Sequence, residues 1–230
     1  MTTHPMKPEH ASAFADIIQE RRSIRAFLPA PVPQDVMEKI FLLANHTPSN
    51  CNTQPWLVHV VSGEKLEILR KEIPAAMLSG NITMDYPYEG KYSGVYRERQ
   101  VGAAEELFGV MNIKREEKIK RNDAFMRNFK FFDAPHVAFL FIPEHFGFRE
   151  AIDIGMYAQS LMLSLTAHGL GCCPQTALGF HADLVRKTLG IDASQKLLFG
   201  ISFGYTDTSA PVNQCRTTPA RVNENVRFYN

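Results

Sequence analysis

The segment from Ile152 to His168 constrains the fold more than any other part of the chain. Apolar residues occur on nearly every side of it, and small residues such as Gly155 and Ala158 are interspersed among them. A helix without a polar face has to be buried, so the remaining chain must form a core around it. The small residues would also let a neighbouring helix, or the same helix of a twin chain across a dimer axis, approach closely. A chain of 230 residues is long enough to bury such a core.

Apolar periodicity predicts many helices and few strands around this segment. A helical stripe ends just before Arg21, and further helices are expected over 33–45, 64–73, 96–113, 115–129 and 182–189. Strands are expected over 56–61, 137–142 and 197–203, the second of them apolar throughout and therefore covered on both faces. This pattern predicts an α+β fold in which helices flank both faces of a small mixed sheet. No G-x-G-x-x-G turn follows the first strand, which disfavours a Rossmann dinucleotide fold.

Two segments do not follow this periodicity within the single domain expected over residues 1–230. From about residue 74 to 95 no period holds, and Pro, Gly and Tyr recur. A loop of this length in a compact domain is usually functional or mobile, so we expect it to act as a lid. The C-terminal extension over about 204–230 is rich in arginine and proline and too irregular to pack alone.

The charge balance limits the kinds of partner. Lys and Arg total 25 against 24 Asp and Glu, a formal net charge of +1. Nucleic-acid binders usually carry a strong basic excess, so no nucleic acid is expected, and a basic cluster in this chain suits one small anion. No apolar run approaches the roughly 20 residues that cross a bilayer, so no membrane partner is expected.

The cysteines and the first residues favour a cytoplasmic protein. The four cysteines form neither a disulfide framework nor a C-x-x-C pair, and Met1 to His10 contain no apolar stretch of the secretory type. We interpret the cysteines as reduced thiols in or near the core. The eight histidines follow no metal-binding spacing, so no metal site is predicted.

Two polar segments are candidates for ligand binding. Arg21 to Arg25, with sequence RRSIR, combines three guanidiniums and a hydroxyl, which could bind a phosphate monoester. Taken alone, it could equally be a solvated basic helix end. The loop Thr47 to Trp56 is rich in hydroxyl and carboxamide groups. Carboxamides both donate and accept hydrogen bonds, as the edge of a flavin pyrimidine ring requires, although a hydrogen-bonded turn beside a buried Trp56 is the other interpretation.

Five segments, taken in order, resemble the nitroreductase family of FMN-dependent oxidoreductases. They are R-R-S-I-R-A-F at 21–27, P-S-N-C-N-T-Q-P-W at 48–56, F-D-A-P at 132–135, D-I-G-M at 153–156 with G-L-G-C at 169–172, and G-Y with P-V-N and Arg216 in the tail. Asn50 departs from the Ser or Gly common at its position. The resemblance covers almost the whole chain and implies the nitroreductase-like fold as an entwined homodimer.

The resemblance implies a set of cofactor-binding residues. Arg21, Arg22, Ser23, Arg25 and Arg216 would hold the phosphate and ribityl end of FMN. Pro48, Ser49, Asn50 and Asn52 would line the isoalloxazine ring, some of them reaching the flavin of the partner subunit, and Arg97 and Gln100 would lie on the flavin. Pro174, Gln175, Thr176 and Ala177 would pass along the ring near N5. A role for Arg221 stays open.

The implied activity is a ping-pong reduction. NADH or NADPH would reduce the flavin and leave, and a flat acceptor such as a nitroaromatic or a quinone would then take its place. The chemistry would occur at flavin N5, so no catalytic Ser, Cys or His is predicted. Two alternatives remain: a flavin-binding storage or regulatory protein with little turnover, and a reductive dehalogenase or flavin-fragmenting enzyme of the same fold.

Overall fold

The four-stranded sheet at the centre of the computed structural model is antiparallel throughout. The strands β1 (Leu57–Ser62), β2 (His136–Pro143), β3 (Gly171–Gln175) and β4 (Gln195–Gly204) follow the order β1-β2-β4-β3. The strands β2 and β3 run in the same direction, but β4 lies between them, so every neighbouring pair is antiparallel. The prediction of a mixed sheet is therefore wrong for the four strands, and a parallel bridge at the edge of the sheet joins Ser23 to Cys172. The structure describes residues 7–230, and residues 1–6 of the Met1–His10 segment lie outside the described part.

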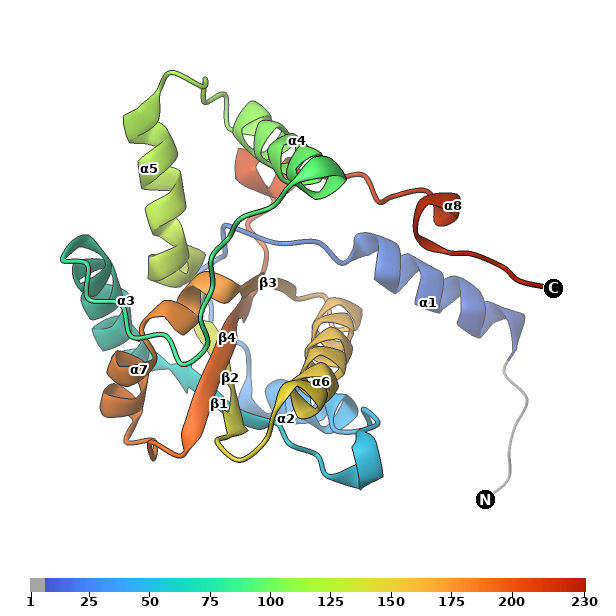
Figure 1. Ribbon diagram of the computed structural model, residues 1–230, viewed down its shortest axis with the longest axis horizontal. Helices are drawn as coiled ribbons and strands as arrows, with labels where there is room; N and C mark the ends of the chain where they lie inside the picture. Colours follow the sequence, from blue (N-terminus) through green and yellow to red (C-terminus); the bar gives the residue numbers. More distant parts are fainter. Residues whose placement is uncertain (1–6) are drawn as a thin grey trace.

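Helices cover both faces of this sheet, as the sequence predicts (Figure 1). On one face, α2 (Gln34–Ala44) and α6 (Phe148–Ala167) form a core with residues such as Leu140 and Ile201. On the other face, α3 (Gly63–Leu78) and α7 (Ala182–Leu189) pack on residues such as Phe139 and Phe141. The strand β2 contributes to both cores, and all of its residues except the last are buried.

The apolar helix α6 is only half buried within one chain. Its inner face includes Ile154, Tyr157 and Leu161, which are buried in the core beside α2. On the outer face, Ile152 is 50% and Met156 39% exposed. The prediction of a helix buried on all sides is thus confirmed on one side only. Within the described chain, the other side of α6 exposes apolar groups to solvent.

The remaining helices depart from the sequence prediction at their ends. The helix α3 continues to Leu78 with Pro74 inside it, α4 spans Gly94–Val110, and α5 spans only Lys118–Met126. After α5 comes a 3-10 turn, η2 (Arg127–Asp133), in which Phe131, Phe132 and Asp133 have left-handed φ values of 59°, 53° and 66°. Such backbone is strained for residues other than glycine, and helical periodicity cannot reveal it.

An arginine of α3 supports the strained η2 turn from outside it. The guanidinium of Arg70 on α3 donates to the carbonyls of Lys130 at 2.6 Å and Ala134 at 2.8 Å. It also lies 5.7 Å from the ring centroid of Phe131. Both carbonyls flank the left-handed residues, so α3 holds the turn in place from the outside.

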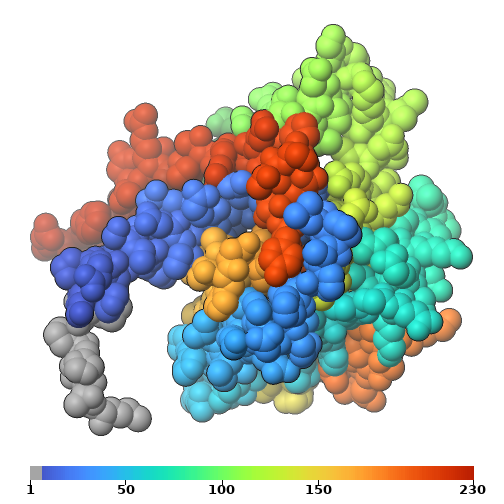
Figure 2. All heavy atoms as spheres, turned by 180° about the vertical axis from the view of Figure 1, so that it is seen from behind, coloured from blue at the N-terminus to red at the C-terminus, as the bar shows by residue number. Residues whose placement is uncertain are grey.

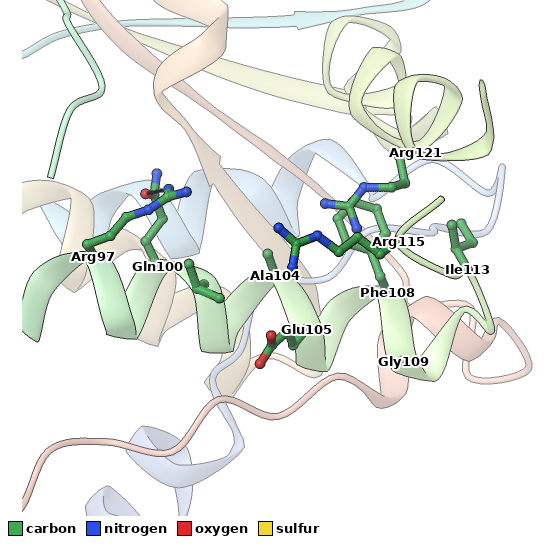
Figure 3. A pocket seen from close by; sticks show the side chains of 10 residues that line it. Arg97, Gln100, Ala104, Glu105, Phe108, Gly109, Ile113, Arg115 and Arg121 are labelled. Atoms are coloured by element: carbon green, nitrogen blue, oxygen red, sulfur yellow. Dashed lines mark hydrogen bonds between the residues drawn. The ribbon is translucent and has the colours of Figure 1, made fainter. Parts of the chain in front are cut away.

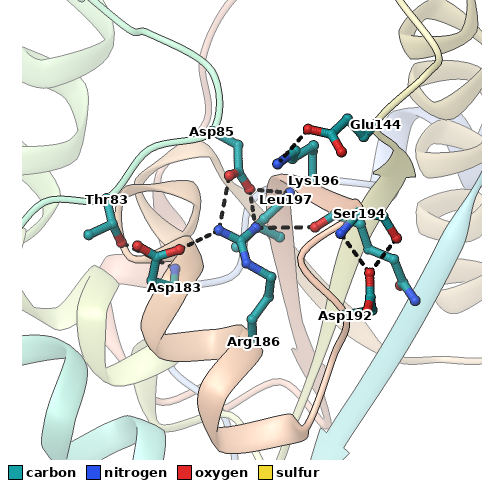
Figure 4. A network of polar contacts seen from close by, with 10 residues as sticks. Thr83, Asp85, Glu144, Asp183, Arg186, Asp192, Ser194, Lys196 and Leu197 are labelled. Carbon is teal, nitrogen blue, oxygen red and sulfur yellow. Dashed lines mark hydrogen bonds and ion pairs between the residues drawn. The ribbon is translucent and has the colours of Figure 1, made fainter.

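Half of the expected lid segment is fastened to the body of the protein (Figure 4). Thr83 forms a bridge with His181 at the start of α7, where the N–H of Thr83 donates to the carbonyl of Phe180. The carboxylate of Asp85, 9% exposed, accepts hydrogen bonds from the guanidinium of Arg186 and, at 2.7 Å, from the N–H of Leu197. Among the described residues, the loop's hydrogen bonds to the rest of the chain end at Asp85.

The two end segments lie side by side on one surface. Helix α1 (Pro8–Glu20) contacts α6, and the C-terminal tail with α8 (Val222–Asn225) runs along α1 (Figure 2). Tail and body are joined by an ion pair between Arg99 on α4 and Glu224 on α8, at 2.9 Å. Within residues 7–230, no helix combines the length and apolarity needed to cross a membrane.

Candidate cofactor site

The basic segment Arg21 to Arg25 follows the end of α1 and lies against the edge of the sheet. The N–H of Ile24 donates to the carbonyl of Cys172 on β3 at 2.9 Å, and the side chain of Ile24 is buried. This approach requires the glycine at 171, because a Cβ there would lie 2.7 Å from Cγ1 of Ile24. Because side chains alternate along an extended chain, burying Ile24 turns Ser23 and Arg25 the other way.

Asn213 in the 3-10 turn η4 (Pro211–Gln214) joins the tail to this basic segment. Its Oδ1 accepts the N–H of Arg25 at 2.7 Å, and its Nδ2 donates to the carbonyls of Ala26 and Asp207, both at 2.8 Å. Its own carbonyl accepts from Nε of Arg22 at 3.1 Å. Asn213 is only 3% exposed, so its carboxamide replaces water for three backbone groups.

These contacts create a basic cavity of about 150 Å³ between the segment and the tail. Its lining includes Arg21, Arg22, Ser23, Arg25, Cys215 and Arg216. The structure thus brings together all five residues predicted to hold a phosphate. The nearest paired carboxylate is that of Glu20, which is well exposed and 3.4 Å from Arg22 and 3.5 Å from Arg216.

The electrostatics of this cavity fit an anion. Burial, followed by the positive charge of Arg216, lowers the pKa of Arg22 below its usual value, and Glu20 partly opposes this shift. A lowered arginine pKa means that the charged form lacks full compensation in the chain itself. Four guanidiniums and one hydroxyl are the donors that bind a phosphate monoester by bidentate and single hydrogen bonds, so the residues present fit the phosphate end of FMN.

The residues Pro174 to Ala177 continue from the same edge of the sheet. Pro174 and Thr176 are exposed, whereas the side chain of Gln175 is buried. The carboxamide of Gln175 donates to the carbonyl of Asn128 at 2.8 Å and accepts from Oγ of Ser202 at 2.5 Å. The side chain of Gln175 is therefore engaged inside the protein, and only its backbone could contact a flavin beside the 3-10 turn η3 (Thr176–Phe180).

The buried thiols of Cys172 and Cys173 beside this edge are unreactive at neutral pH. Burial raises the pKa of Cys173 to about 11, although the charge of Arg25 acts in the opposite direction. Burial likewise raises the pKa of Cys172 to about 12. Both thiols stay protonated at neutral pH and are poor nucleophiles. All four cysteines are free, and all except Cys51 are buried, which confirms the interpretation of core thiols for three of them.

The polar loop lies apart from the basic cavity within one chain. It contains the short turn η1 (Asn50–Asn52), which lies beside α2 and α6 in Figure 1, far from α4 and the end of α1. Cys51, Asn52 and Gln54 have left-handed φ values of 50°, 56° and 47°. The buried carboxylate of Asp153 on α6 holds the loop by accepting the N–H of Asn50 at 3.1 Å.

The side chains of the polar loop are open to solvent at its tip. Oγ of Ser49 accepts the N–H of Gln54 at 2.9 Å, and Asn50 and Asn52 are exposed. Trp56 is partly buried and stacks on Tyr157 with ring centroids 4.9 Å apart. The predicted packing of Trp56 is therefore found, while Pro48, Ser49, Asn50 and Asn52 do not meet the basic cavity in the same chain.

Arg97 and Gln100 also lie away from the basic cavity. Both project from α4 into a separate cavity of about 460 Å³ between α4 and α5 (Figure 3). A guanidinium nitrogen of Arg97 donates to Oε1 of Gln100 at 2.5 Å. The other arginines of this cavity, Arg115 and Arg121, were not singled out by the sequence motifs, and neither was the linking role of Asn213. Only convergence in space marks Arg115 and Arg121, whereas Asn213 belongs to the P-V-N motif of the tail, which does not reveal its contacts.

Comparison with known proteins identifies the class. Residues 18–205 match the model described as "Nitroreductase family". The chain is 44% identical over 219 residues to nitroreductase NfnB of Mycolicibacterium smegmatis, covering 95% of this chain and 93% of that protein. It is 32% identical over 203 residues to the 4-nitrobenzoate reductase of Pseudomonas putida, covering 88% and 89%. The chain belongs to the nitroreductase family.

A solved structure supports the same assignment of fold. It is the FMN-dependent nitroreductase NfnB from Mycobacterium smegmatis in complex with NADPH, and it superimposes with a TM-score of 0.92 at 43% identity. The match covers 96% of this chain and 100% of that one. The α+β architecture and the family predicted from the sequence motifs are thereby confirmed.

The role of Asn213 can be tested by the variant Asn213→Ala. Three hydrogen bonds of its buried side chain are lost, so we expect the free energy of unfolding in urea to fall by about 1.5–4.5 kcal/mol, at roughly 0.5–1.5 kcal/mol each. Amide exchange at Arg25 should accelerate. Asn223→Ala, in the exposed helix α8, is the control and should change neither quantity. Unchanged exchange at Arg25 in Asn213→Ala would contradict the role.

Proposed function

We propose that this chain is an FMN-dependent oxidoreductase that takes electrons from NADH or NADPH and reduces flat acceptors such as nitroaromatics or quinones. The observation that carries the proposal is the basic cavity, in which four arginines and Ser23 converge. The names of the relatives point the same way, since one is an FMN-dependent nitroreductase in complex with NADPH and another a 4-nitrobenzoate reductase.

In this proposal the chain's residues bind and orient, and the cofactor carries the electrons. Arg21, Arg22, Ser23, Arg25 and Arg216 hold the phosphate, and Asn213 fixes their backbone. The backbone from Pro174 to Ala177 passes along the ring. Bound FMN supplies two-electron transfer between a donor and an acceptor that occupy the same place in turn.

The separation of the polar loop from the basic cavity supports a homodimer. We propose that Pro48, Ser49, Asn50 and Asn52 face the flavin held by the partner subunit, with Asp153 fixing the loop. The outer face of α6 and the adjoining α1 expose Ile152, Met156, Phe14 and Ile18, each at least 39% accessible. Apolar groups clustered in this way are typical of an interface.

The mobile lid is shorter in this proposal than the segment of about residues 74–95 that the sequence predicts. The segment up to Asp85 is fastened to α7 and β4, so we propose that only residues 86–93 move over the substrate. This stretch carries Tyr88 and Tyr92, whose hydroxyls lie 3.4 Å apart. We also propose that the protein works in the cytoplasm, which its four free cysteines support.

The activity is tested by anaerobic reduction of the purified flavoprotein. NADH or NADPH should bleach the absorbance band of oxidised flavin at roughly 450 nm, and 4-nitrobenzoate or a benzoquinone should restore it. Yellow protein that neither nucleotide reduces would instead support the storage or regulatory alternative. Colourless protein that cannot be reconstituted with FMN would remove both interpretations.

The phosphate role is tested separately by Arg21→Ala. Losing one charged hydrogen-bonding group should weaken FMN binding by about 1.5–3 kcal/mol, measured by fluorescence titration of the apoprotein. Lys187→Ala, which removes an exposed cation from α7, is the control and should bind FMN normally. Equal FMN affinity in the two variants would refute the assignment of Arg21.

The dimer is tested at Gly155, on the exposed side of α6. A Cβ there meets no atom within 4 Å in the single chain, so Gly155→Trp should fold normally but block a second α6. We expect a sedimentation mass of twice 26.0 kDa for the unaltered protein and a single-chain mass for the variant. Lys187→Trp, on the far side of the sheet, should remain dimeric. A dimeric Gly155→Trp protein would exclude α6 from the interface.

A further inference from the structure

The cavity between α4 and α5 combines unpaired cations with a flat apolar surface (Figure 3). Arg97, Arg115 and Arg121 contribute guanidiniums, and Glu105 contributes the only carboxylate in its lining. Among residues 7–230, none of the three arginines has a carboxylate within 4.0 Å, in contrast to the neighbouring Arg99, which is paired with Glu224. The cavity therefore has an uncompensated positive charge.

An aromatic ring forms part of the same wall. The guanidinium of Arg121 lies over the ring of Phe108, 4.0 Å from its centroid, and Val101, Ala104 and Ile113 extend the apolar surface. A cavity of about 460 Å³ falls within the usual size range of ligand pockets. A planar base could pack on this wall while a phosphate meets the guanidiniums, which are the features of a nucleotide site.

The fold does not need these arginines for its own core. No residue of α4 is buried, and Arg97 and Arg115 are exposed. An arginine that supports structure in this chain, such as Arg70 or Arg186, instead donates to backbone carbonyls and to carboxylates. Apart from the stacking of Arg121 on Phe108, the cluster between α4 and α5 therefore lacks a structural explanation.

Shared lining residues connect this cavity to the basic cavity. A smaller, mainly apolar cavity of about 120 Å³ lies between them. Phe108 lines both this one and the α4–α5 cavity, and Arg25 lines both this one and the basic cavity. The three cavities form a row, so a ligand bound between α4 and α5 could reach toward a cofactor anchored at Arg25.

We propose that the cavity between α4 and α5 binds the adenosine end of the nicotinamide donor, with Arg115 and Arg121 contacting its 2′-phosphate, and that the enzyme therefore uses NADPH in preference to NADH. The assignment of the donor rests on the proposed function. The cavity itself is proposed to bind adenosine 2′,5′-bisphosphate. Its three guanidiniums can pair with a ribose phosphate, and the wall that contains Phe108 can pack against the base.

Direct binding to the FMN-loaded protein tests the site without turnover. In calorimetric titrations, adenosine 2′,5′-bisphosphate should bind at least about tenfold more tightly than 5′-AMP, since an added charged hydrogen bond changes affinity by roughly that factor or more. Arg115→Ala and Arg121→Ala should each remove most of this difference. Lys118→Ala, which deletes an exposed cation from α5 outside the lining, should preserve it.

Stopped-flow reduction tests the donor. The dissociation constant for NADPH should rise about tenfold or more in Arg115→Ala, while that for NADH stays within about twofold. Arg115→Ala leaves the contact between Arg121 and Phe108 in place, and an unchanged circular dichroism spectrum and FMN content would show that the fold is intact.

The outcomes separate the two proposals. Two results would overturn the assignment of the cavity. One is equal affinity for the bisphosphate and 5′-AMP, and the other is an equal loss of affinity for NADPH and NADH in the variants. Neither result would contradict the oxidoreductase activity. Protein that binds the bisphosphate through Arg115 but is reduced by neither nucleotide would support the cavity as an adenosine-phosphate site and overturn the proposed function.

Discussion

The carboxamide of Asn213 is the contact on which the candidate site depends. It bonds to Arg25, Ala26 and Asp207 at the same time, and it therefore ties the tail to a segment nearly two hundred residues earlier in the chain. Together with the ion pair between Arg216 and Glu20, it keeps Arg216 close to Arg21, although the four like charges repel one another. The buried carboxamide supplies the neutral hydrogen bonds that hold the cations together, and a carboxylate in its place would instead neutralise them.

Most of the fold could be predicted from the sequence, because its elements carry strong periodic signals. The strand over 137–142 is continuous and apolar, and it became the central strand β2. The residues 182–189 coincide with α7, where the left-handed Gly190 ends the helix. The convergence of the five residues expected at the phosphate on one cavity is predictable, because Arg21 to Arg25 are contiguous and the family motif includes Arg216. In these places local chemistry and tertiary structure agree.

The rest depends on contacts between distant residues, which a local pattern cannot show. Strand β3 begins at Gly171, two residues after Gly169, and contains Pro174, so its sequence resembles a turn, but pairing with β4 stabilises it. The expected lid seemed free because nothing in its sequence indicates that Asp85 meets Arg186 on α7. The family resemblance places Arg97 on the flavin, and within the single chain Arg97 lines a cavity separate from the basic cavity, which no local pattern indicates. The exposed outer side of α6 is a further difference, because a pattern that is apolar all round predicts a fully buried helix, whereas the single chain covers only one side of it.

Arginine pairing differs between the turns and loops of this protein and its two basic cavities, although Arg22 and Arg216 in one of the cavities are paired with Glu20. Arg70, Arg127 and Arg186 each have a carboxylate within 4.0 Å and support a local turn or loop. Arg21, Arg25 and Arg115 have none among residues 7–230 and line cavities instead. Partial burial of an uncompensated charge costs free energy until an anion arrives. The net charge of the chain is only +1, so we propose that anions bind at these two places, where several guanidiniums face the same space and Glu20 or Glu105 offsets only part of their charge.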